Sequence, residues 1–249
     1  MCSVIILNRP GHDWPILWAS NRDEMVERPW TPPGRHWPDR PDVVAGRDNL
    51  AGGSWLGVNE SGVVAGVLNR RNTLGPQSGK RSRGELVLDA LDFPDAADAV
   101  DMLTQLDAHA FRPFNMVVVD NRDAFWLRNL GHKVEGEKLP TGISMITASD
   151  RNDLNSSRIR WYLPRWQEAA VPNPDTGDWS AWQDLLCDKG HDPNGTVFDA
   201  MNIVSNTGFG TVSSSIIALP AAHFAARKPI WRFVGGRPDR NSAWSEIPL

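Results

Sequence analysis

Three pairs of short apolar runs constrain the fold of this 249-residue chain more than any other feature. Each run is rich in β-branched and aromatic residues, and the two runs of a pair flank a short turn-like segment: CSVIIL with PILWAS, WLGV with VVAGVLN, and FNMVVVD with AFWLRNL. Runs of this kind joined by a turn predict β-hairpins. Further strands are expected in GISMIT, SSSIIALP and PIWRFV. The sequence therefore predicts a framework of β-sheet.

Helical segments fall between these strands in two groups. In SRGELVLDAL, Ser82 followed by Glu85 forms a capping-box pattern, and Pro94 is expected to end the helix. A second helix is expected over residues 95–106. SSRIRWYLPRWQEA and DWSAWQDLLC form the other group, with the first segment interrupted by Pro164. This order of strands, helices, strands, helices and strands predicts an α+β fold in layers.

The segment from Arg28 to Arg47 stands apart because it carries five prolines, Pro29, Pro32, Pro33, Pro38 and Pro41. Proline removes a backbone donor and fixes φ, so we expect this segment to be an irregular loop wrapped over another part of the protein.

Composition excludes several classes of function. The 41% hydrophobic and 22% charged residues predict a soluble globular protein, which we take as one domain over residues 1–249, with no membrane span. A net charge of −4 gives no footprint for nucleic acid, and the basic KRSR at Lys80 to Arg83 is expected to be a solvated loop or helix start. Two cysteines and no leader pattern favour a cytoplasmic location. The six histidines show no metal-ligand spacing, so no metal site is expected.

The start of the chain carries the clearest chemistry. Cys2 directly follows Met1, and removal of that methionine would leave a thiol and an α-amine on one residue. An α-amine has a pKa of about 7.7–8.0 and can act as general base for the thiol. Arg22 could lower the pKa of the thiol, and its neighbour Asp23 could hold the amine. From the spacing alone, a core cysteine and a solvated charged turn remain the alternatives.

Several separated motifs occur together in this chain: MC, ASNRDE, AGRDNLAGGSWLGVNESGVVAGVLN, RGELV, PFNMVVVD and GTVSSSIIALP. In this respect the chain resembles the NRDE family, to which the transport-and-Golgi-organisation-2 proteins belong. That family is similar to the N-terminal nucleophile hydrolases, among them penicillin V acylase and the ceramidases. The resemblance implies a four-layer αββα sandwich with the cysteine of the first strand in a cleft between layers.

The same resemblance implies roles for individual residues. Cys2 would be the nucleophile, Arg22 the partner of the thiolate, Asp23 the residue that holds the amine and Asn69 an oxyanion-hole group. Ligand contacts are expected from residues in or beside these motifs: Asn21, Glu24, Arg47, Asp48 and Trp55. For Arg47 and Asp48, holding the long loop in place is the alternative role.

Two positions depart from the family pattern. Thr147 stands where related sequences have asparagine, and Val212 stands where they have arginine. A hydroxyl can still donate a hydrogen bond, but valine cannot replace a cation, and the loss of an oxyanion donor costs about 3–4 kcal/mol in other enzymes. These departures favour a ligand-handling protein over a hydrolase.

The resemblance implies haem, or a lipid or acyl compound, as the ligand that such a protein binds and moves. Haem would be cargo rather than a catalytic cofactor, held by weak axial ligation in an apolar slot with aromatic faces. Tryptophans near the motifs are compatible with such a slot: Trp14, Trp18, Trp30, Trp37 and Trp55. The alternative is a Cys2-dependent amide hydrolase that needs no cofactor. A scaffold or interaction protein, suggested by the tryptophan excess, is the third possibility.

Overall fold

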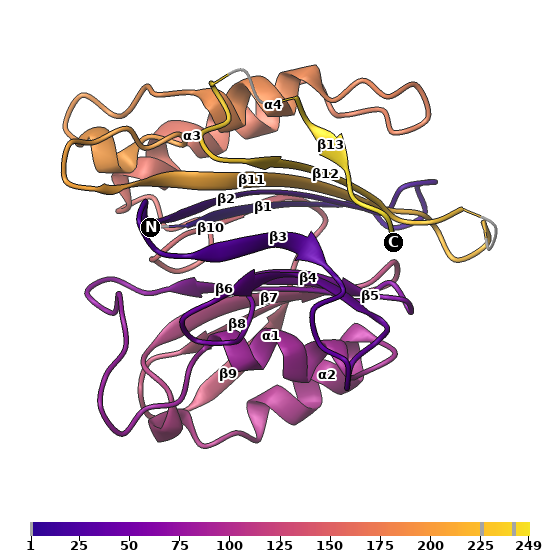
Figure 1. The fold of residues 1–249 in the computed structure, drawn as a ribbon. Helices are drawn as coiled ribbons and strands as arrows, with labels where there is room; N and C mark the ends of the chain where they lie inside the picture. Colours follow the sequence, from indigo (N-terminus) through magenta and orange to yellow (C-terminus); the bar gives the residue numbers. More distant parts are fainter. Residues whose placement is uncertain (1, 225–226, 241–242) are drawn as a thin grey trace.

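Two stacked antiparallel sheets with helices on both outer faces make up the computed structural model, which describes residues 2–224, 227–240 and 243–249 (Figure 1). Within these residues one sheet has six strands in the order β10-β1-β2-β11-β12-β13. Their bounds are Gly142–Ile146, Ser3–Asn8, Ile16–Met25, Phe209–Leu219, Ile230–Gly235 and Ser245–Glu246.

The other sheet has seven strands, in simple sequence order from β3 to β9, over the same described residues. Their bounds are Trp30–Gly34, Val43–Asp48, Leu56–Asn59, Val64–Asn69, Phe114–Val119, Ala124–Asn129 and Val134–Lys138. The predicted hairpins are confirmed: β1 pairs with β2, β5 with β6, and β7 with β8.

The helices cover the outer faces in two pairs. The pair over the seven-stranded sheet is α1, Gly84–Leu91, and α2, Ala96–Thr104. The pair over the six-stranded sheet is α3, Ser157–Glu168, and α4, Ser180–Cys187. Short 3-10 turns occur at Ala108–Ala110 and Val197–Asp199.

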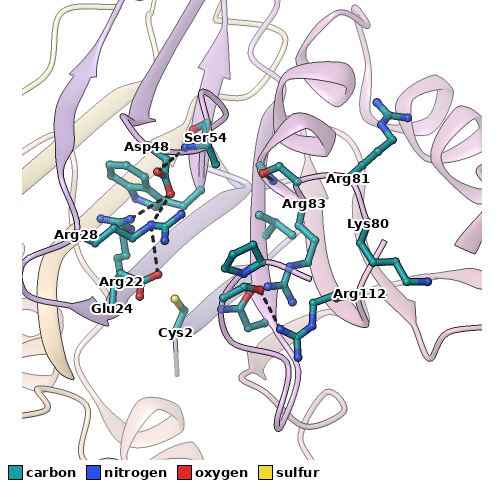
Figure 2. A pocket seen from close by; sticks show the side chains of 18 of the residues that line it. Cys2, Arg22, Glu24, Arg28, Asp48, Ser54, Lys80, Arg81, Arg83 and Arg112 are labelled. Carbon is teal, nitrogen blue, oxygen red and sulfur yellow. Dashed lines mark hydrogen bonds and ion pairs between the residues drawn. The ribbon is translucent and has the colours of Figure 1, made fainter. Parts of the chain in front are cut away.

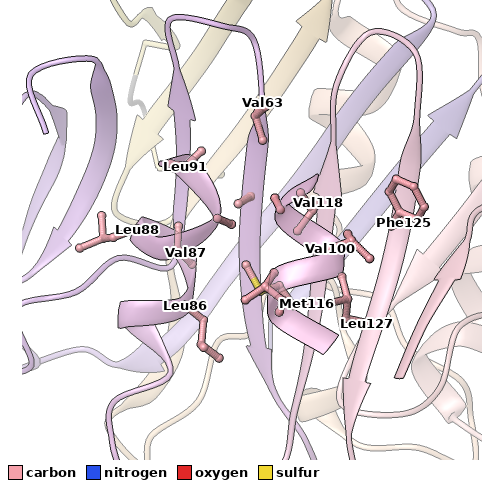
Figure 3. Packing of buried hydrophobic residues seen from close by; sticks show 14 of the residues in the cluster. Val63, Leu86, Val87, Leu88, Leu91, Val100, Met116, Val118, Phe125 and Leu127 are labelled. Carbon is pink, nitrogen blue, oxygen red and sulfur yellow. The ribbon is translucent and has the colours of Figure 1, made fainter. Parts of the chain in front are cut away.

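Three apolar clusters hold the layers together. The cluster between the two sheets contains Trp18 and Trp231, both almost fully buried. A second cluster packs α3 and α4 on the six-stranded sheet, and a third packs α1 and α2 on the seven-stranded sheet (Figure 3). Because burying apolar area is the main stabilising contribution to folding, the clusters explain the stacking. The predicted αββα sandwich is confirmed.

The alternation of side chains along β2 positions the candidate site. Trp18 and Arg22 face the other sheet, whereas Ala19 and Asn21 face the helices α3 and α4. Strand β1 pairs with β2 so that Ser3 lies opposite Asn21, which places Cys2 beside the charged end of β2. The first strand therefore brings its cysteine to the NRDE segment.

The proline-rich segment is more regular than expected. Trp30–Gly34 forms β3, which pairs with β4 on both sides of a register shift between Thr31 and Gly34. Pro32 and Pro33 lie within the shift, and β3 is the outermost strand of its sheet. A proline on an edge strand need not donate to the ladder, so the expectation of an irregular loop throughout this segment was wrong.

Helix α3 is not interrupted at Pro164, contrary to expectation. The exposed Pro164 lies on the solvent side, where a carbonyl that loses its helical partner can bond water, while Ile159, Tyr162 and Trp166 hold the buried side. Packing thus offsets the local cost of the proline.

The capping box at the start of α1 is half formed. The side chain of Glu85 accepts the backbone N–H of Ser82 at 3.2 Å, but the Ser82 hydroxyl accepts from Gly84 rather than from Glu85. The start of the predicted helix is therefore displaced by about one residue, which is common at helix ends.

Candidate active site

A pocket with a volume of about 250 Å³ opens where the ends of β2 and β6 meet the loops before β5 and α1 (Figure 2). Seven of the nine predicted site residues line it: Cys2, Arg22, Asp23, Glu24, Asp48, Trp55 and Asn69. The fold therefore brings together residues that are up to 67 positions apart in the sequence, between Cys2 and Asn69.

Cys2 lies half-buried in this pocket, between its two walls (Figure 2). Its Sγ lies 3.7 Å from the backbone carbonyl oxygen of Asp23. Burial raises the pKa of the Cys2 thiol, the negative charge of Asp23 raises it further, and Arg22 only partly opposes them. The thiol is therefore protonated at neutral pH, and an attack by this sulfur requires a base.

Arg22 lies on the pocket wall with its guanidinium stacked over Trp55, 4.2 Å from the ring centroid. The nearest carboxylate oxygen, of Asp48, is 3.8 Å from its Nη2. Its Nη1 is buried and has no hydrogen-bond partner among the described residues. Desolvation lowers the pKa of Arg22, which nevertheless remains charged near neutrality.

Asp48 holds the wall of the pocket in place. One carboxylate oxygen accepts from Arg28 at 2.8 Å, and the other accepts the backbone N–H groups of Leu50 and Ala51. Glu24 lies 3.8 Å from Arg28. This arrangement matches the structural alternative for Asp48, because its oxygens are engaged in holding the loop and Arg28.

The carboxylate of Asp23 lies on the other face of β2, toward the helices. It accepts from Arg158 of α3 at 3.0 Å and from the Thr211 hydroxyl at 2.7 Å. Arg158 also donates to the Ser3 hydroxyl at 2.6 Å, next to the nucleophile position. Arg158 was absent from the sequence-based site because nothing in its local sequence marks a partner 135 residues away.

Two predicted ligand-binding residues lie elsewhere. Asn21 is buried under the helix layer, where its amide donates to the carbonyls of Leu186 and Met201. Arg47 is exposed on β4, opposite Thr31 of the edge strand. Neither residue lines the pocket. Asn21 instead bonds β2 to the helix layer, and Arg47 lies on the surface.

The two departures from the family pattern also lie outside the pocket lining. Thr147 is buried, and its carbonyl accepts from Asn115 at 2.8 Å. Val212 is buried at the register shift where β11 passes β2. Neither Thr147 nor Val212 therefore lines the pocket that contains Cys2, and neither residue counts directly against hydrolysis there.

Sequence reasoning missed the basic wall opposite Asp48. Lys80, Arg81 and Arg83 line the pocket together with Arg112, which comes from the segment before β7. The KRSR cluster was the available signal, but it was interpreted as a solvated loop, and Arg112 carried no signal of its own. Only the fold places these residues on one wall (Figure 2).

Aromatic side chains contribute less to the pocket than expected. Of the five tryptophans near the motifs, Trp55 lines the pocket, whereas Trp14 and Trp18 are buried in the cores. Across the described residues, His, Cys, Asp and Glu form no group of three or more suited to a metal ion. None of the helices in the described ranges has the length and apolar character needed to cross a bilayer.

Two face-to-face sheets between helix layers, with a cysteine ahead of the first strand, define the fold class of the N-terminal nucleophile hydrolases. Many solved structures match this fold, among them the following three. An N-acylethanolamine-hydrolyzing acid amidase ortholog from Caenorhabditis elegans aligns at TM-score 0.62 and 16% identity, over 99% of this chain and 100% of the other.

Penicillin V acylase from Agrobacterium tumefaciens aligns at TM-score 0.57 and 13% identity, over 99% of this chain and 86% of the other. A mutant of conjugated bile acid hydrolase from Clostridium perfringens aligns at TM-score 0.58 and 12% identity, over 100% and 92%. At these identities the likeness shows the fold alone. A comparison with curated proteins gave no match.

The chain belongs to the Transport and Golgi organisation 2 family, whose model matches residues 1–169. The matched part contains both the NRDE segment at the end of β2 and the whole seven-stranded sheet. The family predicted from the motifs is thereby confirmed.

Proposed function

We propose that the protein is a Cys2-dependent hydrolase of carbon–nitrogen bonds in small acyl amides. The observation that carries this proposal is the joint position in one pocket of the Cys2 thiol, Asn69 and the Arg22 Nη1, which has no hydrogen-bond partner among the described residues. A nucleophile beside hydrogen-bond donors is the arrangement that acyl transfer requires. This reverses the order favoured by the sequence, because Thr147 and Val212 lie outside the pocket.

The proposed reaction uses residues of this chain alone. After removal of Met1, the α-amine of Cys2 takes the thiol proton while Sγ attacks the amide carbonyl carbon. Arg22 and the Asn69 amide donate to the developing oxyanion. The carbon–nitrogen bond then breaks, the proton passes to the leaving amine, and a thioester remains. Water attacks this thioester, which releases the carboxylic acid and restores the thiol.

The raised pKa of Cys2 supports a mechanism that depends on a base. A thiol that is protonated at neutral pH reacts slowly by itself, so the amine has to remove its proton during attack. The structural neighbours support the same reaction class, since they are an acid amidase, a penicillin V acylase and a conjugated bile acid hydrolase.

Turnover of a panel of simple N-acyl amides by the full-length protein tests the proposal, with intact mass recording whether Met1 is removed. We expect turnover by the processed protein, its loss in Cys2→Ser and in protein with a blocked α-amine, and retention in Cys187→Ser. Cys187 is the matched control because it is the other free thiol and lies outside the pocket. Equal turnover by Cys2→Ser would refute the proposal.

Binding of haem, or of a lipid or acyl compound, is the second candidate. The observation in its favour is the Trp55 ring in the same pocket as the Cys2 thiol, which together offer a flat aromatic face and a sulfur ligand. Against it, about 250 Å³ lies below the ~300–1,000 Å³ of ordinary small-molecule pockets, and most of the residues that line the pocket are polar or charged. A haem titration followed by absorbance decides: a shift at micromolar protein, without amide turnover, would favour this candidate.

A further inference from the structure

The wall of the pocket opposite Asp48 carries four cationic side chains, of which Arg81 pairs with Glu85 at 2.7 Å. Both arginines at its centre, Arg83 and Arg112, form no ion pair among the described residues. Arg83 donates to the Thr73 hydroxyl and to the carbonyls of Thr73 and Pro113. Arg112 donates to the carbonyls of Asn72, Leu74 and Gly75. All of these acceptors are neutral, so within the described residues no paired carboxylate balances the positive charges of Arg83 and Arg112.

The two guanidinium groups contact the same loop, residues 72–75, and both line the pocket (Figure 2). Desolvation lowers the pKa of Arg83 to about 10, and the positive charge of Arg112 is the next cause. The two positive charges repel one another. An anion between them would remove this repulsion.

Further donors border the same space. Lys80 lies on the same wall with its ammonium bonded to the carbonyl of His109, a neutral acceptor. The first turn of α1, whose dipole is positive at this end, begins beside Arg83. Across the pocket, the side chain of Arg22 is 5% exposed and its Nη1 is unpartnered among the described residues. A buried donor without a partner indicates that a ligand supplies the acceptor.

We propose that Arg83, Arg112 and Lys80 form a subsite for a phosphate group carried by the ligand of the Cys2 pocket. Each guanidinium keeps N–H groups beyond those bonded to backbone. Lys80 lines the same pocket, and its flexible side chain would turn from the His109 carbonyl toward a bound anion. Three cationic side chains suit a group with three acceptor oxygens and a charge near −2, whereas one bidentate arginine suffices for a carboxylate. This inference rests on the proposed function only in taking the Cys2 pocket as the substrate site.

Calorimetric titration of the full-length protein with inorganic phosphate at low salt tests the subsite, with acetate as the comparison anion. We expect phosphate to bind and acetate to bind at least tenfold more weakly. Arg83→Gln and Arg112→Gln each remove one charge-assisted contact and should weaken phosphate binding about tenfold to a hundredfold. Glutamine keeps an amide that can still donate to the loop carbonyls.

The matched control is Arg122→Met, because Arg122 is an exposed arginine in the β7–β8 turn, at the opposite end of the sheet from Asn69. This variant should bind phosphate as the wild type does. No binding by the wild type, unchanged binding in the Gln variants, or acetate binding as tightly as phosphate would each overturn the proposal. The last result would indicate a carboxylate ligand.

Arg83 and Arg112 also hold the loop at residues 72–75, so their substitution could weaken phosphate binding by disturbing this loop. A variant that leaves the loop contacts intact separates the two effects. Lys80→Met serves this purpose, since Lys80 makes one contact to the surface carbonyl of His109. We expect an unchanged melting temperature and several-fold weaker phosphate binding; full binding would contradict the subsite. Phosphate binding by processed wild-type protein that turns over no amide would refute the hydrolase and leave the subsite standing.

Discussion

Arg22 and Asp23 are neighbours in sequence, but their side chains lie on opposite faces of β2. Successive side chains of a strand point to opposite faces, so Arg22 faces Trp55 while Asp23 faces α3. The buried partner of Asp23 is Arg158, with both side chains at most 1% exposed. Arg158 is therefore the cationic side chain that compensates the buried charge of Asp23.

We predict that Arg158→Met destabilises the protein by about 3–5 kcal/mol, because it leaves the Asp23 carboxylate buried without its cationic partner. Urea denaturation measures the loss. In the double variant Arg158→Met, Asp23→Asn the cost should be clearly smaller than the sum of the single costs. Additive costs would show that the two side chains act independently.

We predict that the alkylation rate of Cys2 rises with pH around a midpoint above the ordinary thiol pKa. Only the thiolate reacts, and burial together with Asp23 raises the pKa of this thiol, so the rise moves to higher pH. The measurement is iodoacetamide labelling of Cys187→Ser protein, followed by mass spectrometry. A midpoint near or below neutrality would show that Arg22 outweighs burial.

At the level of elements, α1 is pressed against the loop that leads into β5. A Cβ placed on Gly53 would lie 2.4 Å from the backbone carbon of Gly84, at the start of α1, and the two segments share a backbone hydrogen bond from Ser54 to Gly84. This contact sets the position of α1 and thus of Arg83, which precedes it. The glycine is required by close approach rather than by its φ angle.

We predict that Gly53→Ala destabilises the protein by about 1–3 kcal/mol, because backbone on both sides has to move apart. Thermal unfolding by circular dichroism checks this expectation. Gly52→Ser is a useful comparison: its Cβ meets nothing within 4 Å, so any cost there comes from the positive φ of 75° instead. Unchanged stability of Gly53→Ala would mean that the contact relaxes freely.

Hairpins and helices were predictable because their signals are local. Apolar alternation with turn residues gave β1–β2, β5–β6 and β7–β8, and the apolar spacing gave α2 and α4. Strand β9, with the sequence VEGEK, was missed because its outer side chains are charged and it lies on a sheet edge. Strand β3 likewise tolerates its prolines because it lies on a sheet edge. Which strand lies on an edge depends on how the whole sheet assembles, so the local sequence does not reveal it.

At the level of the whole molecule, the candidate site was only half predictable. The site residues of the NRDE segment and β6 were predicted. The basic wall was not, because it combines the KRSR cluster with Arg112, which lies far from that cluster in the sequence. Likewise, the distance between Arg158 and Asp23 depends on how α3 docks on the six-stranded sheet. Contacts of this kind follow from packing between layers and leave no trace in local periodicity.

We predict that the protein unfolds in one cooperative transition, because the central cluster takes buried side chains from both sheets. Tryptophan fluorescence and far-UV circular dichroism should give coincident urea curves. Gly53→Ala, which acts on the seven-stranded side, should displace both curves equally. Separate transitions would indicate that the two halves of the sandwich fold independently.

The prolines of β3 bear on how copies of this protein meet in a crowded solution. An outermost strand normally offers free N–H and C=O groups to any strand that approaches, which is how edge-to-edge aggregation begins. Pro32 and Pro33 have no N–H groups to donate, and the register shift between Thr31 and Gly34 interrupts the regular strand there. At the other end of the same sheet, Glu135, Glu137 and Lys138 place charge along β9. Both borders of the seven-stranded sheet thus resist the intermolecular strand pairing from which amyloid grows.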